Sequence, residues 1–254
     1  MFQGKNVLIT GATGGIGSAT AKAFADAGAN LALQSTSPEK LERLTDALAL
    51  PDGRVAGFVL DIGDEASVAD MIRRASAQFG SIDVLVNNAG RLSDATPVIE
   101  LTEEAMLGIL RVNLLGPFFA TKHALRQMKD QGHGSIVTVA STAGIYASPL
   151  LPYVAAKHAL IGFMKNVALE AISYGVRLNI VAPGAVDTPM MDAAAASAGF
   201  GEDIPAFRAM VEGGIPDGRY AKPEEVAEAI FWFASEKSAH TVGQVLVVDG
   251  GEYV

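Results

Sequence analysis

Short apolar runs rich in β-branched residues alternate along the chain with longer stretches of helical character. The short runs predict strands and the longer stretches predict helices. The predicted strands are residues 6–10, 30–34, 54–60, 82–86, 135–140, 176–182 and 244–248. The predicted helices are residues 16–28, 38–49, 64–79, 102–130, 151–174 and 223–235.

This alternation of strand and helix indicates repeated βαβ units. Several strand segments are apolar at successive positions, as expected where helices cover both faces of a parallel sheet. We therefore expect an α/β fold: a doubly wound, Rossmann-like parallel sheet of about seven strands with helices on both faces. Ser37 before Pro38, and Thr102 before two glutamates, are typical of helix starts.

The length of 254 residues fits a single domain spanning residues 1–254, because α/β sheets of this size fold around one continuous core. Residues 185–216 are rich in Ala, Gly and Met and follow the sixth predicted strand. We interpret them as a mobile substrate lid. An ordinary surface insertion explains this stretch equally well.

Composition and charge exclude several classes of partner. A formal net charge of −9 argues against nucleic acid and anionic membranes, since the average field of the protein repels phosphate. The chain has no cysteine, so it has neither a disulfide nor a thiol nucleophile. Its four histidines show no ligand spacing, and we expect no metal site.

The first residues, MFQGKNVLIT, lack the features of a secretory signal, and we expect a cytoplasmic protein. Residues 131–156 contain no Asp, Glu, Lys or Arg, which raises the question of a membrane span. Pro149 and Pro152 interrupt this stretch, so buried protein core is the better interpretation.

The sequence TGATGGIG at residues 10–17 joins the first predicted strand to the first predicted helix. In that position, glycines permit a tight turn and let a pyrophosphate approach the backbone at the N-terminus of the helix. Because Gly14 and Gly15 are adjacent, the run fits both TGxxxGxG and TGxxGxxG. A purely structural turn is the alternative.

Seven motifs in order make the chain similar to the short-chain dehydrogenase/reductase family: TGATGGIG, NNAG at 87–90, Asn113, Ser141, YVAAK at 153–157, PGAVDT at 183–188 and the closing VDGG. The resemblance spans essentially the whole chain and favours the shorter branch with TGxxxGxG. It implies an NAD(P)-dependent oxidoreductase that transfers a hydride between the nicotinamide and a carbonyl or alcohol carbon.

Tyr153 and Lys157 are four residues apart on a predicted helix, so their side chains project from the same face. The resemblance implies that Tyr153 is the acid or base, and that Lys157 both supports its ionisation and holds the nicotinamide ribose. Catalysis near neutral pH requires the phenolate to be stabilised by roughly 3 pKa units, about 4 kcal/mol. Ser141 is implied to bond the substrate oxygen, with Thr142 as the fallback hydroxyl.

Asn113 lies inside a predicted helix, where asparagine has little intrinsic preference. Pro117, four residues later, has no N–H to donate, so we predict that the Asn113 carbonyl is free. The resemblance implies that this carbonyl holds a water in a proton relay to the lysine. A simple proline kink is the alternative interpretation.

At the end of the second predicted strand the chain reads Gln34, Ser35, Thr36 and Ser37. Family members that use NAD often carry an acid there, and no carboxylate is present to repel a 2′-phosphate. We therefore favour NADP(H), with NAD(H) as the alternative. The resemblance implies cofactor contacts at Gly11, Thr13, Gly15, Ile16, Gly17, Ser35, Thr36, Asp61, Ile62, Asn88, Ala89, Gly90, Tyr153, Lys157, Pro183, Gly184, Val186 and Thr188.

Apolar side chains before Tyr153 and in residues 185–216 favour a bulky, poorly charged ketone or secondary alcohol as substrate. They are Tyr146, Pro149, Leu150, Leu151, Met190, Met191, Phe200, Phe207 and Met210. The same residues would also serve to pack the lid or to form a subunit contact.

Two other functions remain open. A 3-oxoacyl thioester reductase is one alternative; it is disfavoured by the acidic chain and by Gly132 and Tyr174, which stand where such reductases tend to carry arginine. A dinucleotide-binding sensor without catalysis is the other. The resemblance further implies a homotetramer or dimer that pairs through residues 102–130 and 151–174.

Overall fold

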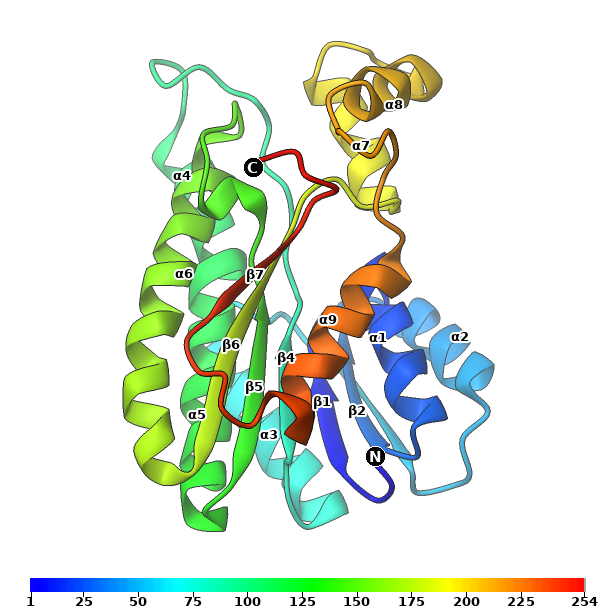
Figure 1. Cartoon of the computed structure of the whole chain (residues 1–254), viewed down its shortest axis with the longest axis vertical. Helices are drawn as coiled ribbons and strands as arrows, with labels where there is room; N and C mark the ends of the chain where they lie inside the picture. The colour runs from blue at the N-terminus through cyan, green and yellow to red at the C-terminus, as the bar shows by residue number, and fades with distance from the viewer. Residues whose placement is uncertain (254) are drawn as a thin grey trace.

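The structure is a computed structural model that describes residues 1–253. Seven parallel strands form one sheet in the order β3-β2-β1-β4-β5-β6-β7 (Figure 1). The strands are β1 (Asn6–Ile9), β2 (Asn30–Ser35), β3 (Val55–Val59), β4 (Val84–Asn87), β5 (Gly134–Val139), β6 (Val176–Pro183) and β7 (Val245–Val248). Each lies within two residues of its predicted bounds, which confirms the predicted sheet.

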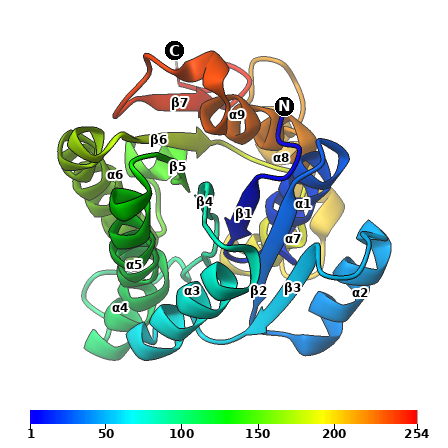
Figure 2. The same ribbon diagram turned by 90° about the horizontal axis from the view of Figure 1, so that it is seen from below.

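Helices cover both faces of the sheet, as Figure 2 shows from below. One face packs against α3 (Glu65–Phe79), α5 (Gly116–Gln131) and α6 (Leu151–Ala171), and the other against α1 (Gly15–Asp26), α2 (Pro38–Leu48) and α9 (Pro223–Ala234). The first interface contains Met71, Leu160 and Met164, and the second contains Phe24 and Phe233, all fully buried. The sheet is therefore hydrophobic on both sides, and the Rossmann-like prediction is confirmed.

The strand order reverses beside β1. Strands β2 and β3 lie on one side of it, and β4 to β7 lie on the other. The connections that leave β1 and β4 therefore run in opposite directions, and a crevice opens between them at the carboxyl ends of the strands. Ligands of doubly wound sheets bind at this edge.

The predicted helix over residues 102–130 is present, but it is not a regular α-helix throughout. Thr102 caps α4 (Glu103–Leu110), a π-helical turn follows at Arg111–Leu115, and α5 begins at Gly116. In the wide turn the Gly116 N–H donates to the carbonyl of Arg111, five residues earlier. Pro117 has no N–H for an ordinary i to i−4 bond, which accounts for the wider turn at this point.

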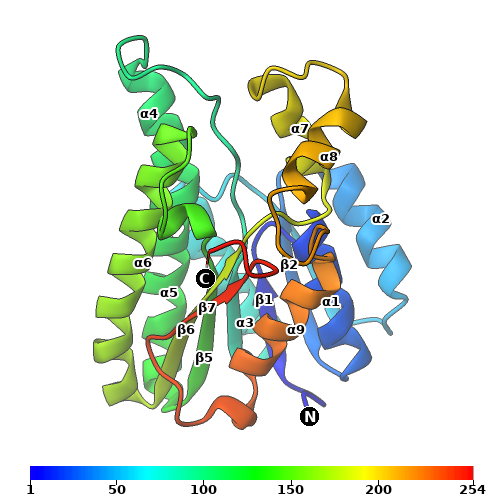
Figure 3. The same cartoon turned by 45° about the horizontal axis from the view of Figure 1, so that its top comes forward.

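Residues 185–216 contain two short helices, α7 (Pro189–Ser197) and α8 (Ile204–Glu212), which stand above the carboxyl edge of the sheet in Figures 1 and 3. Arg208 of α8 pairs with Asp192 of α7 at 2.7 Å and with Asp187 at 2.6 Å. These ion pairs join both helices to the end of the sheet. Nowhere in residues 1–253 is there a helix long and apolar enough to cross a bilayer.

Candidate functional site

A cavity of about 960 Å³ opens at the carboxyl edge of the sheet. Its walls come from the ends of β1, β2, β4, β5 and β6, from α7 and α8, and from the last residues before the C-terminus. Ser141 and every residue expected to contact the cofactor line it: Gly11, Thr13, Gly15, Ile16, Gly17, Ser35, Thr36, Asp61, Ile62, Asn88, Ala89, Gly90, Tyr153, Lys157, Pro183, Gly184, Val186 and Thr188.

The glycine turn between β1 and α1 is packed so closely that three of its positions require glycine. Gly11 has a φ of +62°, and a Cβ added there would lie 2.7 Å from the Cα of Ala89. A Cβ on Gly15 would overlap the side chain of Thr188, and one on Gly17 would overlap the Gly11 carbonyl. At Gly14 the nearest atom would be 3.5 Å away. The required spacing is therefore TGxxxGxG.

The N-terminus of α1 faces this cavity and suits an anion. Its N-cap, Gly14, has no side chain to satisfy the first backbone N–H groups, and the first turn carries no acidic residue. Backbone N–H groups and the helix dipole at such an end stabilise negative charge. The lack of any Cβ at Gly11, Gly15 and Gly17 leaves the backbone open to a pyrophosphate, so these residues fit a dinucleotide.

Hydrogen bonds hold the glycine turn against the end of β4. The Thr10 hydroxyl accepts from the N–H groups of Asn88 and Ala89 at 3.0 and 3.1 Å. The Asn88 side chain donates to the carbonyls of Thr10 and Gly11 at 3.1 and 3.0 Å. Asn87 is buried and ties β4 to Thr121 of α5 at 2.9 Å. The NNAG motif therefore fixes the shape of the crevice as well as lining it.

The end of β2 shapes the cavity beside Thr13. Buried Gln34 accepts from the Gly11 N–H and donates to the Leu60 carbonyl, both at 2.8 Å, so its amide is occupied by the fold. The Ser35 hydroxyl lies 2.8 Å from that of Thr13. Lys40, which the sequence analysis missed, also lines this end. It lies on the first turn of α2, beyond the strand, where the strand pattern gives no indication of it.

Ser37 is less available to a ligand than its position suggests. Its hydroxyl caps α2 by accepting from the Lys40 N–H at 3.2 Å, and it donates to Glu39 at 2.8 Å.

Asp61 accepts from the Gly63 N–H at 2.8 Å, while the cap of α3 is Asp64. Asp61 is therefore a cavity residue rather than the helix cap.

Tyr153 and Lys157 lie on the face of α6 that borders the cavity, and both are almost fully buried. The Lys157 Nζ donates to the Val139 carbonyl at 2.9 Å and lies 5.5 Å from the centroid of the Tyr153 ring. Ser141, two residues after the end of β5, also lines the cavity, and its hydroxyl is close enough to Tyr153 to act on the pKa of the phenol. The structure brings these three predicted residues together.

Burial controls the ionisation of both groups. It raises the pKa of the Tyr153 phenol, and the nearby Ser141 hydroxyl acts in the opposite direction. Burial lowers the pKa of Lys157 to about 8, because the ammonium is removed from water without a carboxylate partner. The protein alone therefore does not produce a phenolate at neutral pH, and further positive charge is needed for it.

Asn113 does not line the cavity, in contrast to the other predicted catalytic residues. It is fully buried in the π-helical turn, where its side chain accepts from the Arg91 N–H at 3.0 Å and donates to the Arg91 carbonyl at 2.8 Å. A Cβ on Gly90 would lie 2.8 Å from the Asn113 Oδ1 and 3.8 Å from the Lys157 Nζ. Asn113 thus supports the loop that separates it from Lys157.

The remaining wall is mostly apolar. Of the predicted substrate residues, Pro149, Leu150, Met190, Met191, Phe207 and Met210 line the cavity. Tyr146, Leu151 and Phe200 are absent from its described lining. Phe200 instead packs edge-on against Phe207 at 5.7 Å. Six further lining residues have no motif that predicts them, because the fold brings them to the cavity from distant segments: Arg91, Leu92, Ala95, Ser197, Glu252 and Tyr253.

Known proteins match the chain from end to end. A family model described as enoyl-(acyl carrier protein) reductase matches residues 11–252. A 3-oxoacyl-[acyl-carrier-protein] reductase of Thermotoga maritima is 40% identical over 253 residues, which are 98% of each chain. The cis-4-hydroxycyclohexanecarboxylate dehydrogenase of Sinomonas cyclohexanicum is 38% identical and covers 98% of this chain and 97% of its own. The crystal structure of levodione reductase superposes with a TM-score of 0.94 at 33% identity, covering 99% and 98% of the two chains.

Proposed function

The chain belongs to the short-chain dehydrogenase/reductase family, and from that premise we propose that it uses NADP(H) to interconvert a bulky, weakly charged ketone and its secondary alcohol. Membership makes it an NAD(P)-dependent oxidoreductase of alcohols and ketones. The preference for NADP(H), the roles of individual residues and the substrate class are the proposed part. The observation that carries the proposal is the meeting of Ser141, Tyr153 and Lys157 on one cavity wall beside the glycine turn.

In the reductive direction, Tyr153 donates its phenolic proton to the carbonyl oxygen. The nicotinamide, when bound, supplies the hydride, and in its oxidised form a positive charge. Ser141 donates a hydrogen bond to the same oxygen as negative charge develops there. Lys157 supplies a positive charge near the Tyr153 ring. Its Nζ is held in that position by the hydrogen bond to the Val139 carbonyl. The pKa of the phenol, which burial raises, falls only when these charges are assembled.

Asn113 contributes in two ways under this proposal. Its side chain positions the loop at Gly90 and Arg91 beside Lys157. Its carbonyl, four residues before Pro117, holds a water that passes protons to Lys157. The π-helical turn at Arg111–Leu115 supports this role, because it replaces the ordinary i to i−4 hydrogen bonds of the backbone around Asn113.

The cofactor residues divide into three groups. Gly11, Gly15 and the N-terminus of α1 bind the pyrophosphate with Thr188 beside them. Asp61, Ile62 and the NNAG segment surround the adenosine, and residues 183–186 face the nicotinamide. Thr36 and Lys40 bind a 2′-phosphate, since Thr36 is exposed at this end and Lys40 supplies the positive charge. Glu39 opposes this charge, so the preference for NADP(H) depends on Lys40.

The substrate class follows from the apolar wall formed by Leu150, Met190, Met191, Phe207 and Met210. Apolar surface of this extent gains free energy by burying a bulky carbon skeleton. The Sinomonas relative is named for a cyclohexane secondary alcohol that also carries a carboxylate, so its name supports the reacting group and the carbon skeleton but not the lack of charge. We propose that α7 and α8 act as the lid over this substrate.

Reduction of a 3-oxoacyl thioester is a second candidate, and the 40% identity to the Thermotoga reductase favours it. Gly132 and Tyr174 lie close together at the ends of α5 and α6, and the Lys129 ammonium stands 4.5 Å from the centroid of the Tyr174 ring. Lys129 is therefore one cation available for docking of a carrier protein at this surface.

A panel of substrates separates these functions. We expect the kcat/KM for cyclic and aromatic ketones to be at least tenfold above that for acetoacetyl thioesters. Oxidation of NADPH, measured by absorbance at the nicotinamide band, gives both values. Lys40→Ala should lower the preference for NADPH over NADH by about tenfold, equivalent to about 1.4 kcal/mol. Faster thioester reduction would favour the second candidate, and cofactor binding without turnover of any substrate would indicate a sensor.

We also propose a cytoplasmic homo-oligomer, a tetramer or dimer that pairs through α4, α5 and α6. Leu107 on α4, Leu115 before α5 and Leu169 on α6 support it, since their side chains are apolar and exposed. Size-exclusion chromatography with light scattering, which measures the molar mass in solution, tests the oligomeric state. A mass of one chain at micromolar concentration would rule it out.

A further inference from the structure

The last residues before the C-terminus turn back over the cavity. After β7 ends at Val248, the Asp249 carboxylate accepts from the Gly251 N–H at 3.0 Å and from the Tyr253 N–H at 3.2 Å. Gly250 and Gly251 have φ values of +64° and +86°, which permit this tight reversal. Figure 3 shows the segment crossing the carboxyl edge of the sheet between the entrance of α6 and the helices α7 and α8.

An aromatic contact fixes this C-terminal segment to the entrance of α6. The Tyr146 and Tyr253 rings are stacked, with centroids 4.1 Å apart and planes 8° from parallel. The Tyr146 hydroxyl also donates to the Tyr253 carbonyl at 3.0 Å. Since Tyr146 stands on the loop that leads to Tyr153, the segment has a fixed position relative to the proposed acid.

Glu252 is held in this segment so that its carboxylate lines the cavity. A Cβ added to Gly184 would lie 3.1 Å from the Glu252 Oε2, so the carboxylate covers the backbone next to Pro183. Burial raises the pKa of Glu252 and so does the neighbouring Asp249, while only the Tyr253 hydroxyl acts in the opposite direction. The carboxylate therefore costs folding free energy where it stands, which is expected of a group kept for function.

The other charges around the cavity do not neutralise this carboxylate. The Lys157 Nζ bonds the Val139 carbonyl, and the Arg91 guanidinium lies against Gly108 of α4. Lys40 lies at the opposite, adenosine end. Among residues 1–253, the acidic side chains of the lining are Asp61, at the adenosine end, and Glu252, so Glu252 is the carboxylate at the substrate end.

Building on the proposed function, we propose that Glu252 determines substrate charge: it admits neutral molecules, favours those with a hydroxyl or amino donor, and excludes those with a carboxylate near the reacting carbonyl. A like charge in a partly dehydrated pocket opposes binding because Coulomb repulsion is poorly screened there. A donor group, in contrast, gains a charge-assisted hydrogen bond. On this basis the chain differs in substrate charge from relatives named for hydroxycarboxylates.

The test uses two unreactive ligands of equal size, cyclohexanecarboxylate and cyclohexanecarboxamide. Their dissociation constants are measured by calorimetry on the full chain saturated with NADPH, for the wild type, Glu252→Gln and Glu228→Gln. Glu228 is exposed on α9 outside the cavity, so its substitution removes the same net charge without changing the wall. Binding does not require turnover, so this test remains valid even if no ketone is reduced.

We expect the wild type to bind the carboxamide at least tenfold more tightly than the carboxylate. Glu252→Gln should reduce that ratio by about tenfold, mainly through tighter binding of the carboxylate, and Glu228→Gln should leave it unchanged. Equal affinities in the wild type, or a ratio unaltered by Glu252→Gln, would overturn the proposal. In turnover, the pair methyl 4-oxocyclohexanecarboxylate and 4-oxocyclohexanecarboxylate should show the same shift as a change in KM.

Discussion

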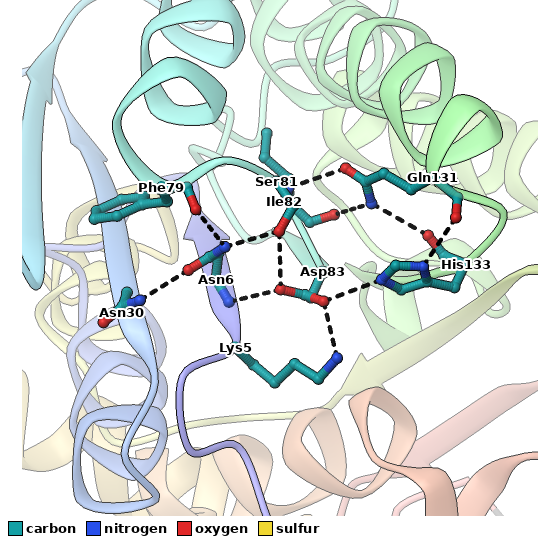
Figure 4. Close-up of polar contacts among 9 residues, drawn as sticks. All are labelled: Lys5, Asn6, Asn30, Phe79, Ser81, Ile82, Asp83, Gln131 and His133. Carbon is teal, nitrogen blue, oxygen red and sulfur yellow. Dashed lines mark hydrogen bonds and ion pairs between the residues drawn. The ribbon is translucent and has the colours of Figure 1, made fainter.

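Buried polar side chains are paired with one another at one edge of the central sheet and face a cavity at the other. At the amino edge, Figure 4 shows a closed network centred on Asp83, whose carboxylate accepts from the Asn6 N–H at 2.9 Å, from Lys5 at 3.0 Å and from Ser81 at 3.3 Å, and contacts His133 at 3.2 Å. At the carboxyl edge, buried Tyr153 and Lys157 face a cavity instead.

This contrast is visible in the pKa values. Burial by itself would raise the pKa of Asp83, but hydrogen bonds from Asn6, Lys5 and His133 outweigh burial and hold the pKa below its ordinary value. At Lys157 burial is unopposed and lowers the pKa to about 8. A charge at the amino edge therefore stabilises the fold, whereas the charge at the carboxyl edge destabilises it and remains available for chemistry.

Tyr153→Phe should produce the largest effect. Removing the proposed proton donor should lower kcat by about 1,000-fold, within the range of general acid catalysis, with little change in cofactor affinity. Steady-state rates and NADPH titrations measure the two quantities. Tyr174→Phe, which removes a hydroxyl bonded only to Glu170 in the described hydrogen bonds, should retain normal rates. Normal turnover in the Tyr153 variant would exclude Tyr153 as the acid.

Asp83→Ala should cost about 3 kcal/mol of unfolding free energy, because it leaves several buried donors without an acceptor. Denaturant unfolding measures this loss, and turnover of the folded variant should be normal. Asp26→Ala is the matched control: its ion pair with Lys22 at 2.9 Å is exposed, so the loss should stay below about 1 kcal/mol.

The lowered pKa of Asp83 also predicts how stability responds to acid. The unfolded chain takes up this proton at a higher pH than the folded chain, so the contribution is present above pH 4 and is lost as the pH falls through the folded pKa. Asp83→Asn should therefore flatten the loss of stability on acidification. An identical acid profile would show that the network contributes nothing through charge.

Lys157→Met should change stability in the opposite direction to Asp83→Ala. We expect it to raise the unfolding free energy at pH 7 and to abolish activity. A pKa lowered from 10.5 to about 8 corresponds to about 3 kcal/mol. Losing the bond to Val139 costs about 1 kcal/mol, which leaves a gain of about 2 kcal/mol. The folded pKa is the depressed one, so wild-type stability should rise between pH 8 and 10.5 as the unfolded chain alone retains the proton. The variant should lack this rise, and Lys22→Met should keep it.

Gly15→Ala and Gly14→Ala test the carboxyl edge at neighbouring positions. A methyl at Gly15 overlaps Thr188, whereas one at Gly14 meets no atom closer than 3.5 Å. We expect at least a tenfold loss of cofactor affinity in the first variant and less than a threefold change in the second, measured by NADPH fluorescence. Equal losses in both would assign the effect to backbone stiffness rather than to the steric contact.

Local patterns in the sequence determined much of this protein. The order of strands and helices, the caps at Ser37 and Thr102, and the glycine turn each depend on residues within a few positions of one another. So does the shared face of Tyr153 and Lys157, because a helical turn fixes their separation. Such features need no knowledge of distant segments.

The tertiary structure alone decided the rest. Residues 102–130 contain a continuous apolar pattern, yet the backbone widens around Asn113, where Pro117 lacks an N–H and the side chain bonds Arg91. The sequence could not choose between Gly14 and Gly15, because the choice depends on contact with Thr188, more than 170 residues later. Glu252 reaches the cavity only because β7 pairs with β6 and Tyr253 stacks on Tyr146. Contacts across such separations depend on how the elements pack, which no local periodicity encodes.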